Sequence, residues 1–162
     1  MWWALAAITL NGITIQASTE ARYLGIIFDK QLRYKAHTRQ AVKKGTNAAL
    51  ALPRTAKCNW GPPYQYARQL FKAVIVPRID YGSVIWHKPK ADGSTAGLAY
   101  IQKLTTVQRL AMKAILGCYR TTPTAAMEIE SGLPPTWIRL QTKPLLSVTR
   151  MQSLSARHFI QT

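Results

Sequence analysis

From about Arg33 onward, the apolar and small residues of this 162-residue chain recur at every third or fourth position. This spacing places them on one face of an α-helix, where they can pack against other elements. We predict a first helix over residues 35–57, with Pro53 ending or kinking it. Its inward face is expected to consist of small or apolar residues: Thr38, Ala41, Gly45, Ala48 and Leu52.

The same periodicity continues to the carboxyl end. Residues 79–86 fit a helix or a strand by pattern alone, and we favour a helix interrupted from the preceding one by Pro77. Gly117 stands where a helix C-cap belongs, Thr122-Pro123 is typical of a capped helix start, and Pro144 is a candidate kink. The remaining expected elements are helices over 64–76 and 98–116, a loop over 87–97, a short helix from Thr122-Pro123 to Gly132, and a last helix from Pro134-Pro135 to about Phe159.

The amino end has a different period. Residues 8–16 alternate apolar and polar around Asn11-Gly12, a dipeptide typical of a two-residue hairpin turn. Residues 23–28 form a continuous apolar run, which predicts a strand buried on both faces. In isolation this strand would be an exposed apolar edge, so we expect self-association through residues 23–28. The predicted fold is mainly α: a small β element over residues 1–32 followed by a helical domain over 33–162.

Charge indicates the kind of partner. The chain has 22 Lys and Arg against 6 Asp and Glu, a net charge of +16, which attracts polyanions. Residues 30–57 hold eight basic residues and no acid, so they lack the mixed-sign pairs that solvated helices usually form. The basic residues are spread over several helices instead of bordering one large apolar face, which argues against a membrane surface. The candidates for nucleic-acid contacts are Lys35, Arg39, Lys43, Lys44, Arg68, Lys72, Arg109 and Lys113.

The sequence offers few residues that could form a catalytic site. Glu128 and Glu130 are two positions apart on a predicted helix and point in different directions. The three histidines, at 37, 87 and 158, have no partner at a recognised catalytic spacing and are expected to be surface or capping residues. Cys58 and Cys118 lack metal-ligand spacing and are expected to be reduced, partly buried thiols. We predict no catalytic residue, no metal site and no cofactor.

Three collinear segments resemble the reverse transcriptases of non-LTR (LINE-type) retrotransposons. They are residues 23–32 (YLGIIFDKQL) with His37, residues 70–82 (LFKAVIVPRIDYG) with Trp86, and residues 120–135 (RTTPTAAMEIESGLPP) preceded by Gln108-Arg109. The resemblance implies that residues 8–28 are the last strands of a polymerase palm. Residues from about 33 would then be the helical thumb and the connection that follows it. Such a thumb contacts the backbone of the template–primer duplex, and the family's habit of copying into chromosomal DNA implies a nuclear location.

The sequence also departs from the family. The family's polymerase chemistry uses Mg ions held by paired palm aspartates, and this chain has no Asp-Asp pair. We therefore expect a polymerase fragment that binds template–primer nucleic acid without catalysing primer extension. Two alternatives remain open at this stage: a stand-alone basic nucleic-acid-binding helical protein, and a transposon relic without selected activity.

Overall fold

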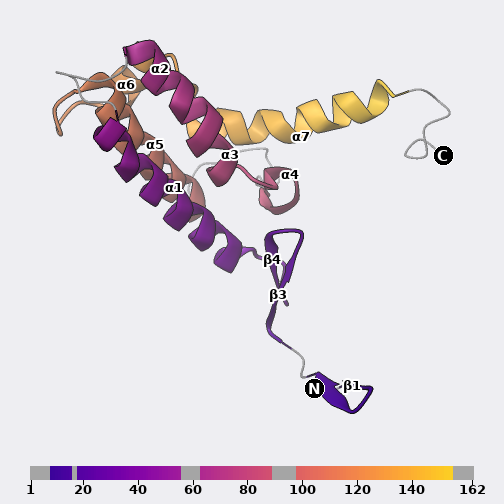
Figure 1. The fold of residues 1–162 in the computed structure, drawn as a ribbon. Coiled ribbons are helices and arrows are strands. Elements are labelled where there is room, and N and C mark those ends of the chain that lie inside the picture. The colour runs from indigo at the N-terminus through magenta and orange to yellow at the C-terminus, as the bar shows by residue number, and fades with distance from the viewer. Residues whose placement is uncertain (1–7, 16–17, 56–62, 89–97, 155–162) are drawn as a thin grey trace. The chain divides into compact units, whose positions relative to one another are not determined.

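The turn at Asn11 and Gly12 forms the first described element of the chain, a short antiparallel hairpin (Figure 1). Strand β1 (Ile8–Leu10) pairs with β2 (Ile13–Ile15), and the two turn residues have φ angles of 50° and 77°. Positive φ at both positions is what a two-residue hairpin turn requires. The hairpin predicted over residues 8–16 is confirmed.

The computed structural model describes residues 8–15, 18–55, 63–88 and 98–154. Several predictions fall outside them: Cys58, His158, most of the loop over 87–97, and the ends of the first and last helices at 57 and 159. The chain divides into two units, Met1–His37 and Thr38–Thr162, and each is described by itself below.

A second hairpin occupies the segment predicted as one continuous strand. Strand β3 (Glu20–Tyr23) pairs with β4 (Ile26–Asp29), and the chain turns at Leu24 and Gly25 with φ angles of 46° and 82°. Of these two strands only Ile26 is buried, while Tyr23 is 67% exposed. The prediction of a strand buried on both faces over 23–28 is wrong, because Gly25 supplies the turn that reverses the chain.

His37 belongs to this first unit and is buried, with 4% of its surface exposed. Its Nδ1 accepts a hydrogen bond from the backbone N–H of Ile27 at 3.4 Å. The expectation of a surface or capping histidine is wrong for this residue. It instead ties β4 to the start of the first helix.

Helix α1 (Lys35–Thr55) carries its small residues inward, as predicted. Ala41, Gly45, Ala48 and Leu52 are buried, and Thr38 is half-buried. Pro53 lies inside the helix and does not end it. A Cβ atom built on Gly45 would overlap Cγ2 of Ile79 and would lie 3.1 Å from Cγ1 of Val107. Gly45 is therefore where α1 approaches two other helices too closely for any side chain.

The next helix continues through Pro77, where the sequence predicted an interruption. It consists of α2 (Tyr64–Leu70), a π-helical turn η1 (Phe71–Ile75) and α3 (Val76–Ile79). The N–H of Val76 donates to the carbonyl of Phe71 across the wide turn. Proline has no N–H and crowds the preceding turn of an ordinary α-helix, and a π turn directly before Pro77 gives its ring room. The prediction that Pro77 breaks the helix is wrong.

The helix predicted over 79–86 exists only as α4 (Ser83–Trp86). Asp80 ends α3, and Gly82 turns the chain with a φ of 63°. The indole N–H of Trp86 donates to the carbonyl of Tyr81 at 2.7 Å and closes this turn.

Three further helices complete the second unit. They are α5 (Ala99–Leu116), α6 (Thr124–Ser131) and α7 (Thr136–Gln152). Gly117 caps α5 with a φ angle of 63°, as predicted, and Gly132 caps α6 with a φ angle of 57° where that helix was predicted to end. Thr122 does not cap α6: Pro123 is extended and precedes the helix, so the hydroxyl is one residue too far away. Pro144 lies within α7 without ending it.

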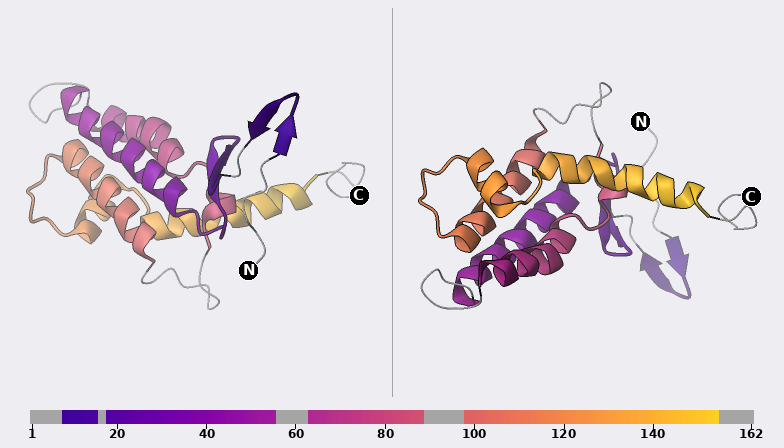
Figure 2. Two further views of the ribbon diagram at one scale, coloured as in Figure 1. Left: turned by 90° about the horizontal axis from the view of Figure 1, so that it is seen from below. Right: turned by 90° about the horizontal axis from the view of Figure 1, so that it is seen from above.

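The core of the second unit lies among these helices. In Figures 1 and 2, α1, the α2–α3 helix and α5 lie side by side, and the carboxyl half of α7 extends beyond them. The mainly helical fold class is confirmed. Large side chains that are fully buried belong to five of the described helical elements: Phe71, Ile75, Ile79, Leu104, Met112, Met127 and Leu140.

Gly45→Ala is expected to destabilise the protein, although the change normally favours a helix by about 1 kcal/mol. Overpacking against Ile79 costs about 1–3 kcal/mol, so we expect a net loss of about 1 kcal/mol in chemical denaturation. Ile79→Ala removes the overlapping methyl group, so the effect of Gly45→Ala should reverse in that background. Asn47→Ala, at an exposed position of α1, is the control for helix propensity; equal effects at both positions would contradict the close contact.

Candidate nucleic-acid interface

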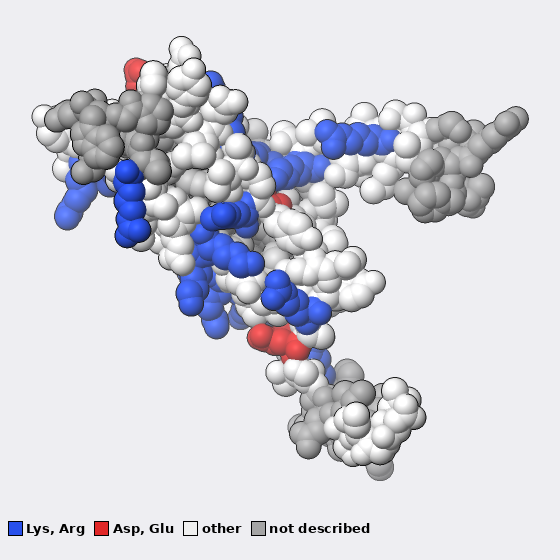
Figure 3. All heavy atoms as spheres, in the orientation of Figure 1, with Lys and Arg blue, Asp and Glu red and all other residues white. Residues whose placement is uncertain are grey.

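The outer face of α1 is basic and free of acidic residues. We define this face as Arg39, Lys43, Asn47, Leu50 and Arg54, all of which are exposed. At 100° per residue they fall within an arc of about 80°, directly opposite the buried side of the helix. In Figure 3, Lys and Arg spheres gather over α1 and the adjoining α2–α3 helix, with few Asp or Glu spheres in that region.

The other predicted cations of α1 flank this face. Lys35 lies one helical turn before Arg39, and Lys44 lies about 100° around the helix from Lys43. Both side chains are exposed. The four predicted α1 residues therefore occupy the solvent side of one helix, with Lys44 on its opposite edge from Lys35.

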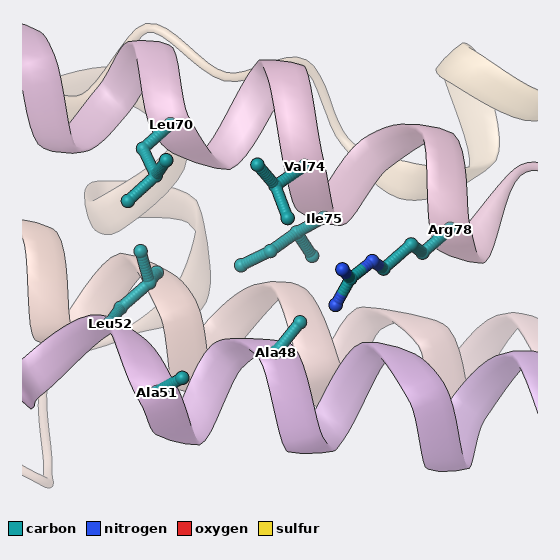
Figure 4. A pocket seen from close by; sticks show the side chains of 7 residues that line it. All are labelled: Ala48, Ala51, Leu52, Leu70, Val74, Ile75 and Arg78. Atoms are coloured by element: carbon teal, nitrogen blue, oxygen red, sulfur yellow. The ribbon is translucent and has the colours of Figure 1, made fainter.

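An apolar groove runs between α1 and the α2–α3 helix (Figure 4). Its volume is about 140 Å³, and its lining includes Ala48, Leu52, Val74 and Arg78. The guanidinium of Arg78 reaches toward α1 across this groove. Sequence reasoning missed Arg78, because it ended the helix at Pro77 and so did not extend the helical face to the next residue.

Arg68 is bound within the protein. The sequence predicted that it faces outward, but its side chain is half-buried. Its Nε and Nη2 donate to the carbonyls of Ser131 and Gly132 at 2.7 and 2.8 Å. These carbonyls lie at the carboxyl end of α6, where a cation is favoured by the helix dipole. The guanidinium thus joins α2 to α6, while Lys72, one turn further on, remains exposed.

Arg109 is also bound within the protein. Its Nη2 donates to the carbonyls of Arg120 and Thr122, each at 3.2 Å. Arg109 lies roughly 200° around α5 from Val107, the residue that approaches Gly45 of α1. Lys113 is half-buried one turn beyond Arg109. Arg109 and Lys113 therefore lie on the side of α5 away from α1, and the eight predicted residues do not share one face.

A buried ion pair links α3 to α7. The carboxylate of Asp80, whose side chain is fully buried, accepts from Nε of Arg139 at 2.7 Å and from Nη2 at 3.3 Å. Nζ of Lys143 lies 3.0 Å from the same carboxylate. Asp80 was not among the site residues predicted from the sequence. The sequence contained a signal that could have found these partners: Arg139 and Lys143 are four apart and so share a helix face.

Gln108 extends the pair into a network. Its Oε1 accepts from Nη1 of Arg139 at 2.6 Å and from the hydroxyl of Thr136 at 3.1 Å. Its Nε2 donates to the carbonyl of Pro134 at 3.1 Å and to Glu128 at 3.4 Å. Burial raises the pKa of Glu128, while the Gln108 hydrogen bond and the charge of Arg139 oppose that shift. The network joins α3, α5, α6 and α7 and leaves these polar groups engaged with one another.

His87 is buried beside aromatic rings, although the sequence predicted a surface or capping histidine. It is 5% exposed, and the hydroxyl of Tyr100 lies 2.9 Å from its Nδ1. The rings of Trp86 and Tyr100 lie edge-on to the imidazole, with centroids 6.5 and 6.0 Å away. Burial lowers the pKa of His87 from its ordinary value of 6.5.

The described residues show neither a metal cluster nor a membrane span. No three His, Cys, Asp or Glu side chains among them gather closely enough to hold an ion. None of the helices that the structure describes is both long and apolar enough to cross a bilayer. Cys118 is a free, half-buried thiol.

Fold and charge together define a basic, mainly helical protein segment with a small β element. Sequence relatives indicate more closely which class of protein it resembles. The "Retrovirus-related Pol polyprotein from type-1 retrotransposable element R1 4" of Nasonia vitripennis is 31% identical over 134 residues, covering 83% of this chain and 32% of that protein. An R1 Pol polyprotein from the same species is 28% identical, covering 82% of this chain and 37% of the relative. One from Bradysia coprophila is 27% identical, covering 88% of this chain and 14% of the relative.

These relatives confirm the resemblance: the chain is similar, over most of its length, to a segment of LINE-type retrotransposon Pol polyproteins of the R1 kind. It spans between 14% and 37% of the length of these three relatives. No family model matches the chain. No solved structure matches it either.

Asp80→Asn is expected to destabilise the protein by about 3–5 kcal/mol, because it leaves the buried guanidinium of Arg139 without its counter-charge. Lys143→Gln should cost less than about 1 kcal/mol, since a third of the Lys143 side chain is exposed and the Asp80–Arg139 pair survives. Urea denaturation measures both. Glu130→Gln, which removes an exposed carboxylate, is the matched control; a loss at Glu130 as large as that at Asp80 would contradict the role of the buried pair.

Stability is expected to fall as pH drops below 6.5, with part of the loss due to His87. The unfolded chain binds a proton at His87 near pH 6.5, whereas the folded chain binds it only at lower pH, so protonation favours unfolding across that window. His87→Gln should remove this part of the loss, and Tyr100→Phe should retain it. Urea midpoints at pH 7.5 and 5.5 test this, and an unchanged difference between the two pH values in His87→Gln would rule it out.

Proposed function

We propose that this chain is the thumb and connection segment of a LINE-type retrotransposon reverse transcriptase. In this proposal it binds template–primer nucleic acid through the outer face of α1. The observation that carries the proposal is the absence of any Asp or Glu on a 21-residue helix whose solvent side holds exposed Lys and Arg. Such a face lacks its own counter-charge, and phosphate supplies one.

The geometry of α1 suits contact with a nucleic-acid backbone. Arg39 and Lys43 are one turn apart, about 6 Å along the axis, and Arg54 lies about 22 Å from Arg39. These three cations, with Lys35 and Lys44 flanking them, can reach several phosphates of one duplex. Contacts of this kind fix position and carry little sequence information, and an RNA–DNA hybrid adds 2′-hydroxyl groups to the contacted surface.

Primer extension is not part of the proposed activity of this chain. Two-metal phosphoryl transfer needs carboxylates that hold the ions, and the family's motif places two aspartates side by side. The aspartates of this sequence stand alone at positions 29, 80 and 92. Asp80 is held by Arg139 and Lys143, which occupy its carboxylate with protein cations. The catalytic functions of the longer relatives are therefore not assigned to this chain.

A salt titration of binding to an RNA–DNA hybrid tests the proposal, with duplex DNA and single-stranded RNA measured alongside. If five to eight phosphates are neutralised, log affinity should fall with log salt at a slope of about −4 to −7. Arg39→Gln/Lys43→Gln should weaken binding and reduce the magnitude of the slope by about 1.8. Arg68 and Arg109 are left intact, because their backbone hydrogen bonds hold the fold together.

The matched control is Lys103→Gln/Arg150→Gln, which makes the same change in net charge at exposed positions of α5 and α7. Its slope should equal that of the unmodified protein. Equal losses in both double variants would show that net charge binds without a specific face. Weak binding with no preference among the three nucleic acids would favour the relic alternative.

A further inference from the structure

Helix α7 turns two of its three cations, Arg139 and Lys143, inward. Its three cations, Arg139, Lys143 and Arg150, fall within an arc of about 40° at 100° per residue. Two of them reach the buried carboxylate of Asp80. The fully buried Leu140 lies on the same side of the helix. The side that packs on α4 and α5 is therefore the basic side.

The opposite side of α7 is apolar and exposed. Trp137, Ile138, Leu145 and Val148 fall within an arc of about 100° and are 45%, 36%, 67% and 50% exposed. We call these four residues the apolar face of α7. Met151 borders it, about 40° from Trp137, and is 46% exposed. The residues interleaved along this face carry no charge: Gln141, Thr142, Thr149 and Gln152.

This arrangement is the reverse of that on α1. On α1, small residues face inward and cations face solvent, which is the usual amphipathic pattern. On α7, an apolar stripe faces solvent along a helix whose carboxyl half extends beyond the other helices (Figures 1 and 2). A contiguous exposed apolar stripe of this kind is typical of an interaction surface.

We propose that the apolar face of α7 docks against the same face of a second copy of this chain. The spacing favours helix–helix pairing: Ile138 and Leu145 are seven apart, as are Gln141 and Val148, which is the repeat of a two-helix seam. When both copies pair through the same surface, the resulting dimer has twofold symmetry.

The lack of charge on this face excludes partners that are held by charge, and it allows two copies of the chain to approach one another here. Nucleic acid and acidic proteins require cations, and the cations of α7 point away from this face. Two copies that each carry +16 repel one another, and the repulsion is weakest where both surfaces are uncharged. The hydroxyl groups of Thr142 and Thr149 can donate and accept, so they are compatible with an identical surface.

The exposed apolar area of α7 limits the affinity expected for the dimer. Two copies pairing through the apolar face and its borders would remove on the order of 1,000 Å² from water. This lies at the lower end of the range for specific interfaces, so we expect a weak dimer that dissociates on dilution.

Sedimentation equilibrium in 0.5 M NaCl, on protein freed of nucleic acid, tests the proposal independently of the proposed function. The unmodified chain should pass from monomer to dimer between about 1 and 100 µM. Leu145→Lys/Val148→Lys should weaken the dimer at least tenfold while circular dichroism shows the same helix content. Leu145→Gln/Val148→Gln, which adds no charge, should weaken it less and provides a second variant if the lysines disturb folding.

The matched control is Tyr119→Lys/Ile129→Lys, which makes the same change in charge at residues 86% and 80% exposed. This variant should dimerise like the unmodified chain. Tyr23→Lys separates the α7 interface from the self-association predicted for residues 23–28. A monomer at 100 µM, a dimer that survives both α7 variants, or a dimer lost only in Tyr23→Lys would each overturn the proposal.

Discussion

The buried carboxylate of Asp80 is the constraint on which the helical unit depends. It ends α3 and holds Arg139 and Lys143 of α7, and through Arg139 it connects to Gln108 of α5. A buried charge is tolerated only when its partners and hydrogen bonds are complete, so the packing of these helices must satisfy one network at once. Because that network holds Arg139 and Lys143 on the inner side of α7, it also leaves the apolar side of α7 facing solvent.

The positive charge of the chain therefore serves two purposes. Arg68, Arg109 and Arg139 are occupied by backbone carbonyls or by Asp80. Arg68 and Arg139 join helices that are distant in sequence, and Arg109 holds the loop that follows its own helix. The cations on the outer face of α1 have no acid on their own helix to pair with. The first group stabilises the fold, and the second group is the one that our proposal assigns to nucleic acid. Composition alone makes no distinction between them, since both groups contribute equally to the net charge.

The elements predicted correctly are those that local chemistry decides. Asn11-Gly12 makes a hairpin turn, Gly117 and Gly132 end helices, and the spacing of Ala41, Gly45 and Ala48 defines the inner side of α1. The errors arise where a neighbouring turn or a partner further along the chain overrides the apolar pattern. Pro77 was expected to break a helix that a neighbouring π turn preserves, and Leu24-Gly25 reverses a run that looked like one strand. His37 and His87 were expected at the surface, yet each is buried next to a partner that the sequence does not place nearby.

The sequence by itself determined the helical period, the small β element, the excess of positive charge and the resemblance to LINE-type elements, because each of these follows from residue type and local spacing. Only the tertiary structure decided which cations remain exposed. Whether Arg68 reaches solvent or the carbonyls of α6 depends on a contact across more than sixty residues. The same holds for Asp80, whose partners on α7 are about sixty positions away. Long-range pairing of buried charge has no local pattern, so it becomes visible only when the helices are packed together.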